Sequence, residues 1–199
     1  MLDHNIVSGI QWYSTEDNSQ GPTVAVETLN NAIKDKWSNA LVRIDSYTHT
    51  FNNGSSDITY TTSYNGMKAR LPEAQEIANA VGHDTWDEST ATASNFFYFD
   101  SKSHEATVGY DKEVKISAYD WLFNNLNWGS AGTNASDSST CLYWGCTQNL
   151  GKTLGDMGYW TSTAVAGSFK DAWYIPYPGY ITDNRVIFEF GIRPVITLN

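Results

Sequence analysis

The two cysteines are the residues with the clearest capacity for chemistry. Four residues, Leu-Tyr-Trp-Gly, stand between Cys141 and Cys146. Gly145 permits a tight turn, so a disulfide that closes a small loop is feasible, and two unpaired thiols are the alternative. A zinc site is not expected, because neither a second cysteine pair nor a close pair of histidines accompanies them.

The other residue types that serve in catalysis form no recognisable set. No Gly-x-Ser-x-Gly motif is present, and no pair of carboxylates stands out. The run Asn134–Asp137 lacks the spacing of a known calcium loop. We interpret each histidine as a solvated side chain rather than a base: His4, His49, His83 and His104. The sequence therefore predicts no catalytic residue, no metal and no cofactor.

A polar and aromatic segment near the C-terminus is the candidate for binding. It follows two runs predicted to be strands, Gly158–Thr163 and Ala172–Ile175, and precedes a third, Gly191–Leu198. The segment between the second and third runs is rich in Tyr, Asp, Asn and Arg. A stiff sheet that displays such a loop favours a binding surface over a catalytic centre.

Composition restricts the possible partners. The net charge is -10, and the sequence contains no cluster of Lys and Arg. Nucleic acid and anionic membranes are therefore not expected as partners. No apolar run reaches the roughly 18 residues of a membrane span, so we expect no insertion by this segment. Charged residues make up only 17% against about 25% in typical globular proteins. That pattern favours an extracellular or cell-surface protein anchored by a segment absent from this chain, with a cytosolic protein as the alternative.

The first half of the chain is predicted to contain one helix and three strands. A strand is expected within Asn5–Tyr13. A helix starting at Pro22 has its apolar face at Val26, Leu29, Ile33 and Trp37, and Lys34 and Lys36 in its last turn. Strands over Leu41–Tyr47 and Ile58–Tyr64 form a hairpin around the turn Asn52–Ser56.

Further on, a short strand ends at Leu71 and a second helix opens at Pro72. Its acidic first turn contains Glu73 and Glu76, and Gly82 caps its end. A short helix follows from Ser117–Asp120, and residues 127–157 form a long loop. We therefore predict one α+β domain spanning residues 1–199, with two main helices, antiparallel sheets and long irregular loops.

The order of these motifs resembles a known fold. Ala69–Ile77 resembles the strand-to-helix segment of C-type lectin-like domains, in the branch shared with the formylglycine-generating, sulfatase-modifying enzymes. Gly158–Thr163, Ala172–Trp173 and Gly191–Ile196 are similar to the end of that fold, especially in non-enzymatic domains of bacterial surface and pilin-like proteins. The resemblance implies paired N- and C-terminal strands, two helices and a smaller sheet with a ligand-facing surface.

Some proteins of this fold are diversified by retroelements at surface positions near the C-terminus. The residues here whose types suit such a surface are Tyr174, Tyr177, Tyr180, Asp183, Asn184 and Arg185. An ordinary aromatic-rich hairpin is the alternative. The motifs also imply structural roles for Arg70, Glu76, Trp160, Trp173 and Arg193, with Glu76 as the candidate partner of Arg70.

Three functional hypotheses follow. The first is a non-catalytic, adhesin-like head that binds a protein or glycan ligand. The second is a structural pilin-like or wall-associated subunit whose aromatic residues pack on neighbours. The third is an oxidase of the formylglycine-generating type or a hydrolase. The enzymes' cysteine pair belongs to the last part of the fold, whereas Cys141 and Cys146 precede the Tyr159–Trp160 strand. The Glu-Pro-Asn and Trp-Asn-Asp motifs of calcium-dependent sugar binding are missing as well.

Overall fold

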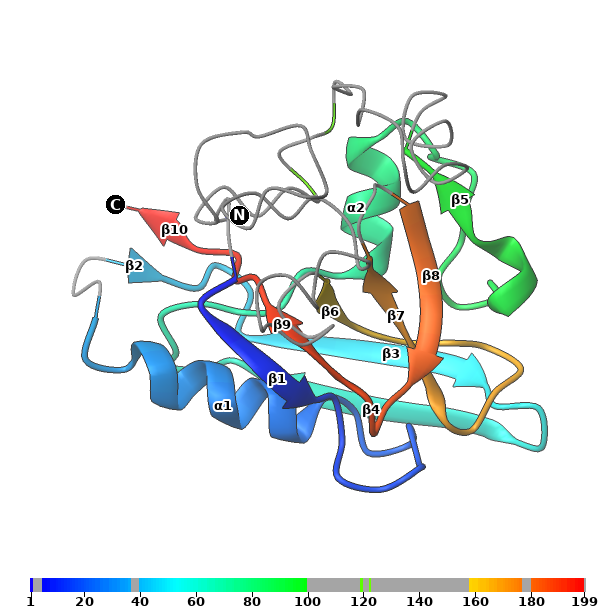
Figure 1. The fold of residues 1–199 in the computed structure, drawn as a ribbon, viewed down its shortest axis with the longest axis horizontal. Helices are drawn as coiled ribbons and strands as arrows, with labels where there is room; N and C mark the ends of the chain where they lie inside the picture. The colour runs from blue at the N-terminus through cyan, green and yellow to red at the C-terminus, as the bar shows by residue number, and fades with distance from the viewer. Residues whose placement is uncertain are drawn as a thin grey trace, which may run out of the picture.

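A computed structural model describes residues 1, 5–36, 40–99, 119, 122, 158–176 and 180–198. These residues form an α+β fold with two α-helices, a six-stranded mixed sheet and a two-stranded hairpin (Figure 1). The helices are α1 (Thr23–Ile33), α2 (Ala74–Ala80) and the 3-10 helix η1 (Ala93–Asn95). The strands are β1 (Val7–Gln11), β2 (Ala40–Leu41), β3 (Ser46–Asn52), β4 (Asp57–Ser63), β5 (Phe97–Tyr98), β6 (Tyr159–Ala164), β7 (Asp171–Ile175), β8 (Tyr180–Arg185), β9 (Glu189–Ile192) and β10 (Thr197–Leu198).

The strand order of the large sheet is β1-β9-β6-β7-β8-β5. β6 and β9 run parallel, and every other neighbouring pair is antiparallel. The pairing of β1 with β9 places the N-terminal strand beside a strand from the C-terminal part of the chain. Two smaller sheets, the β3–β4 hairpin and the β2–β10 pair, complete the described fold.

Strand β6 is the centre of the core, because all six of its residues are buried. One apolar cluster joins α2 to Trp173 of β7 and Ile181 of β8. A second cluster joins the β3–β4 hairpin to Trp160 and Tyr174. A third packs α1 against Ile192 of β9. In Figure 1, α1 lies along β1, and α2 lies behind the β7–β8 end of the sheet.

Both predicted helices are present, and their ends follow from local chemistry. α1 ends at Ile33, so the placement of Lys34 and Lys36 in its last turn is wrong. α2 begins at Ala74, where Glu73 and Glu76 form a reciprocal capping box that satisfies free backbone N–H groups. Gly82 follows the end of α2 with φ +83°, a conformation that suits glycine.

The hairpin is confirmed, but its first strand lies further along the chain than predicted. β3 runs over Ser46–Asn52 rather than Leu41–Tyr47, so it shares only Ser46 and Tyr47 with the predicted strand, and Leu41 belongs to β2. The reason is the strict alternation from Ser46 onward, which turns Tyr47, His49 and Phe51 inward. The interpretation of His49 as solvated is wrong, because its side chain is 2% exposed.

The predicted C-terminal loop is wrong in one important respect. Residues 180–185 form strand β8, which pairs with β7 from Thr182 to Arg185 and with β5 at Tyr180 and Ile181. Backbone pairing explains the difference, since a polar strand on a half-exposed sheet carries no apolar alternation. The third predicted run is also divided, into β9 and β10, around Arg193 and Pro194.

Several predictions lie outside the described residues. They are the cysteine pair Cys141 and Cys146, the long loop 127–157, Asn134–Asp137, Tyr177, His4 and His104, and most of the predicted helix near Ser117. None of the helices described here has the length and apolar character needed to cross a membrane.

Candidate functional site

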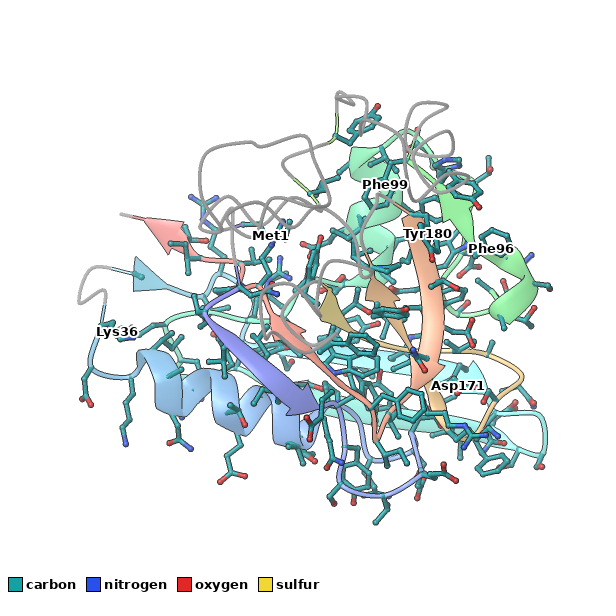
Figure 2. All side chains as sticks on the ribbon, viewed as in Figure 1. Met1, Lys36, Phe96, Phe99, Asp171 and Tyr180 are labelled. Carbon is teal, nitrogen blue, oxygen red and sulfur yellow. The ribbon has the colours of Figure 1, made fainter. Side chains whose placement is uncertain are left out.

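The candidate binding residues that the structure describes, all but Tyr177, lie on the neighbouring strands β7 and β8. The register pairs Trp173 with Asp183 and Ala172 with Asn184, so the polar part of β8 runs beside β7. Tyr180 and Arg185 occupy opposite ends of β8. Figure 2 shows Tyr180 at the upper end of this strand and Asp171, the partner of Arg185, at the lower end. The structure therefore does not gather these residues into one cluster.

Tyr174 is largely withdrawn from solvent. Its side chain is 9% exposed, and its ring stacks on Phe190 with 4.2 Å between the ring centroids. Burial raises the pKa of the Tyr174 hydroxyl, and a hydrogen bond with Asn184 acts in the opposite direction. Tyr174 therefore supports the sheet from within, and the half-buried Asn184 of β8 contacts it.

The remaining residues of β8 differ in their surroundings. Burial raises the pKa of the Asp183 carboxyl, and Thr182 Oγ1 lies 3.4 Å from Asp183 Oδ1. Arg185 is exposed and forms an ion pair with Glu16 at 3.1 Å. At the other end, the Tyr180 ring lies 5.3 Å from that of Tyr98 in β5, centroid to centroid. This upper end continues into the aromatic surface of Tyr98 in β5 and of Phe96, which directly follows η1.

That surface leads to a cleft of about 480 Å³ beside β5. Its lining includes His83, Trp86, Asp87, Asn95, Phe96 and Phe97. The sequence analysis did not assign this site, and of its lining residues it named only His83. The lining residues all lie within residues 83–97, a largely irregular segment after α2 that carries no periodic pattern from which the cleft could be predicted.

The cleft adjoins the upper end of β8 through η1 and β5. η1 contacts β8, and β5 pairs Phe97 with Ile181 and Tyr98 with Tyr180. Phe96 is 46% exposed, and its ring meets that of Tyr98 edge-on at 5.9 Å. Figure 2 shows Phe96 and Tyr180 toward the same side of the molecule. A row of rings thus connects the cleft with the predicted binding strand.

Hydrogen bonds fix the walls of the cleft. Trp86 Nε1 donates to the Asn95 carbonyl at 2.8 Å, which joins the loop after α2 to η1. His83 Nε2 lies 3.0 Å from the Tyr98 carbonyl. The Trp86 ring also meets the buried ring of Trp173 edge-on at 5.2 Å. The surface side chains of the cleft are therefore supported by core residues.

The cleft has a negative electrostatic character. The hydroxyl and backbone N–H of Ser89 donate to Asp87, which lowers the pKa of that carboxyl and keeps it ionised near neutral pH. Among the described residues that line the cleft there is no lysine or arginine. Anionic ligands are disfavoured at such a site, and cationic or neutral ones are compatible with it.

The scaffold residues lie in the core. Arg70 Nη1 donates to Glu76 Oε2 at 2.7 Å and to the Leu71 carbonyl at 3.0 Å, while Nη2 donates to Glu76 Oε1. The structure therefore places Glu76 against Arg70, as the sequence analysis expected. Trp160 and Trp173 are fully buried. The Arg193 guanidinium, also buried, lies over the Tyr159 ring at 4.7 Å from its centroid.

A second group of polar side chains meets at the junction of α2, β3 and β6. Tyr47 donates its hydroxyl proton to Glu88 Oε1 at 2.9 Å, and Thr163 donates to Glu88 Oε2 at 3.0 Å. The backbone N–H of Gln75 donates to the same carboxylate at 2.9 Å. Burial raises the pKa of Glu88. Because the carboxylate is occupied by three donors, the arrangement is that of a structural junction rather than a general base.

His49 belongs to this interior too. Its ring stacks on Phe51 at 5.0 Å, and its Nε2 lies 3.1 Å from the Ala164 carbonyl. Burial lowers the pKa of His49 to about 4. In the part of the chain that the structure describes, no three His, Cys, Asp or Glu side chains gather where they could hold a metal ion.

Comparison of the chain with protein families, with curated proteins and with solved structures gave no match in any of the three.

Proposed function

We propose that this protein is a non-catalytic, adhesin-like ligand-binding head that acts outside the cell or at its surface. The observation that carries the proposal is the cleft of about 480 Å³ beside β5, which opens next to the upper end of β8. The lining combines three aromatic side chains with a larger number of polar ones, and a concave site that joins rings with fixed polar groups is a feature of ligand sites.

The contacts that hold the aromatic side chains of the cleft in place favour ligand binding. Phe96 and Trp86 offer ring surface at the cleft, while Trp86 is held by Asn95 and Trp173. A side chain that is already fixed loses little conformational entropy when a ligand arrives. Large amphipathic rings held in this way are the usual anchors of a recognition surface.

The finer fold assignment is part of the same proposal. We infer a single C-type lectin-like domain of the non-enzymatic kind. Its support is the pairing of β1 with β9, the bridge between Arg70 and Val195 that leads into α2, and the buried Trp160 and Trp173. In that case the half-buried Tyr180, Asp183 and Asn184 are positions at which genetic diversification would alter recognition.

A protein or a glycan is the proposed ligand. The net charge of -10 and the acidic cleft oppose a polyanion, so nucleic acid is not proposed. Arrays of surface proteins and glycans, probed with the purified chain, test the proposal. We expect captured ligands to be lost on Phe96→Ala and Tyr180→Ala.

The matched control is Phe188→Ala, because Phe188 is exposed to the same extent as Phe96, 46%, but lies in the turn after β8. Capture that is equally sensitive to Phe188 would place the binding surface elsewhere. Capture of nothing on either array would contradict the binding head.

A structural subunit is the second candidate, and one observation favours it. Phe169 is 56% exposed and Phe188 46% exposed, in the turn before β7 and the turn after β8. The backbone N–H of Val186 donates to the Lys170 carbonyl at 2.9 Å, so these turns lie together. Concentration-dependent assembly that is abolished by Phe169→Ala and Phe188→Ala, and not by Phe96→Ala, would support packing between subunits.

A further inference from the structure

We propose that the cleft beside β5 binds an organic cation, either a protonated amine or a quaternary ammonium group, carried by the ligand. This inference rests on the proposed binding function and names the chemical group that the cleft recognises. It is argued from the rings, the charge and the preorganisation of the site.

Three aromatic residues line the cleft. Phe97 is buried, and Trp86 meets it edge-on at 5.5 Å between centroids, so the two rings form a corner. Phe96 adds an exposed ring from the neighbouring position. An alkylammonium group bound against aromatic faces is attracted by their electron density, and desolvation in a concave site strengthens the attraction. Such rings also pack against the methyl or methylene groups around the cationic nitrogen.

The negative charge of the cleft and of the whole chain favours a cationic ligand over the other ligands that could contact these aromatic rings. Asp87 is the one carboxylate among the described lining residues, and hydrogen bonds from Ser89 lower the pKa of a carboxyl that is ionised near neutral pH. The chain as a whole has a net charge of -10, which attracts cations from solution. An anion would meet a carboxylate with no lysine or arginine on the described walls to offset the repulsion.

The site is formed before the ligand arrives. His83 packs on Phe97 with 4.2 Å between ring centroids, and its Nε2 is tied to the Tyr98 carbonyl. Asp87 is held both by Ser89 and by the turn in which its carbonyl accepts the Ala91 N–H at 2.8 Å. Affinity is gained when neither the rings nor the carboxylate must be ordered on binding.

The volume of the cleft limits the size of the group that can bind in it. A cleft of about 480 Å³ lies at the lower end of the range for drug-sized sites, roughly 300–1,000 Å³. It accommodates a choline-like head group or the end of a lysine side chain. The remainder of a large ligand would then lie over the rings of Tyr98 and Tyr180, which continue from the cleft along β5 and β8.

Isothermal titration calorimetry with small probes tests the inference near neutral pH and at low salt. The probes are choline, butylammonium, the uncharged carbon isostere of choline in which tert-butyl replaces trimethylammonium, and methyl glucoside. We expect choline or butylammonium to bind, and the isostere to bind at least about tenfold more weakly, because only the cation gains the ring and carboxylate attraction.

Variants locate the binding. Asp87→Asn keeps an oxygen acceptor for Ser89 but removes the charge, and is expected to weaken choline binding about three- to tenfold. Phe96→Ala is expected to weaken it by a similar factor. The matched controls are Asp57→Asn, an exposed carboxylate of the hairpin, and Phe188→Ala, and both should bind as the unchanged chain does.

Equal affinity for choline and its isostere would overturn the inference, as would binding that is insensitive to Asp87→Asn. So would binding of methyl glucoside alone, which would assign a neutral sugar to the cleft. Competition on the arrays separates the two proposals. Ligands captured through Phe96 but not displaced by choline would leave the binding head intact and remove the cation site. Choline bound in the cleft with no ligand captured would do the reverse.

Discussion

At the junction of α2, β3 and β6, polar side chains face partners inside the protein, whereas in the cleft beside β5 they line an open space. Glu88 shows the first situation, with three donors on its carboxylate. The carboxylate of Asp87, the preceding residue, accepts hydrogen bonds from Ser89 and lines the open cleft. Two adjacent acids thus have opposite roles.

The difference shows how this fold separates stability from recognition. A shifted pKa alone would direct attention to Glu88, His49 and Glu73, all of which are partly or fully enclosed by structural contacts. The geometry directs attention to the cleft instead. Changes at the junction should therefore lower the free energy of unfolding, and changes at the cleft should lower binding while leaving stability almost unchanged.

The largest effect is expected for Trp160→Ala, below the junction in β6. Trp160 is fully buried, meets Phe190 edge-on at 4.9 Å and donates from Nε1 to the Ile10 carbonyl at 2.8 Å. Truncation leaves a cavity and an unpaired carbonyl, so the free energy of unfolding should fall by about 3–5 kcal/mol. Urea unfolding followed by circular dichroism measures it. A loss below about 1 kcal/mol would contradict the central place given to β6.

Arg70→Met tests the ion pair at the start of α2. The Arg70 side chain is 8% exposed and that of Glu76 is 36% exposed. Removing one partner of a fully buried pair costs about 3–5 kcal/mol, and the partial exposure of Glu76 reduces this to roughly 2–3 kcal/mol. The control is Arg185→Met, which breaks the exposed pair with Glu16 and should cost no more than about 1 kcal/mol. Equal losses from the two variants would refute the distinction.

Tyr60→Phe removes one hydroxyl from the interior of the hairpin. That hydroxyl donates to the Ser162 carbonyl at 2.7 Å and accepts the Ala164 N–H at 3.0 Å. Leaving two buried backbone groups of β6 without a partner should cost about 2 kcal/mol in chemical denaturation. Thr48→Val, on the exposed face of the same hairpin, serves as control and should cost within about 0.5 kcal/mol. A neutral Tyr60→Phe would show that the hydroxyl does not bind β6 to the hairpin.

The Glu73→Gln variant tests the comparison through the pH dependence of the free energy of unfolding. Burial, and after it the nearby Glu76, raises the pKa of Glu73 from 4.5 to about 7. The folded state then holds that proton more tightly, so this contribution to stability is present below about pH 4.5 and is lost as pH rises toward 7. His49 acts in the opposite sense, because its lowered pKa of about 4 makes stability fall as pH drops below its usual 6.5.

The unfolding free energy of the Glu73→Gln variant should therefore fall more steeply on acidification from pH 6.5 to 4.5 than that of the unchanged chain. Thermal unfolding across this range measures the difference. Identical pH profiles for the two proteins would show that Glu73 does not retain its proton in the folded state.

The smallest effect on stability is expected at the cleft. Phe96→Ala removes a ring that is 46% exposed, so the free energy of unfolding should change by no more than about 0.5 kcal/mol. Ligand capture should nevertheless be lost, as described above. A destabilisation comparable to that of Tyr60→Phe would mean that Phe96 serves the core, and the contrast between the two regions would disappear.

Local chemistry let the sequence predict much of the fold. The apolar spacing of Leu29 and Ile33 indicated α1, the Asn-Gly turn indicated the hairpin, and Glu73 with Glu76 indicated the start of α2. Each of these signals acts over a few residues of chain. The partnership of Arg70 and Glu76 could also be anticipated, because both belong to one short motif.

The binding region was predicted less completely, and the reason lies in long-range pairing. β8 has no apolar alternation, so only its ladder with β7 reveals it as a strand. Its pairing with β5 then brings Tyr180 to Tyr98, from parts of the chain more than eighty positions apart in the numbering. His83, Asp87 and Phe96 belong to one segment, residues 83–97, but that segment is largely irregular, and no periodic pattern indicated that it folds around a cleft.

The sequence by itself thus determined the fold class, the helices, the hairpin and the acidic, aromatic character of the surface, because these depend on composition and on neighbours along the chain. Only the tertiary structure decided which side chains are buried in the core and which remain accessible to a ligand. His49 is enclosed because β3 packs against β6, and Asp87 lines a cleft because the loop after α2 meets the edge of the sheet. Burial depends on contacts between distant segments, and those contacts exist only once the chain has folded.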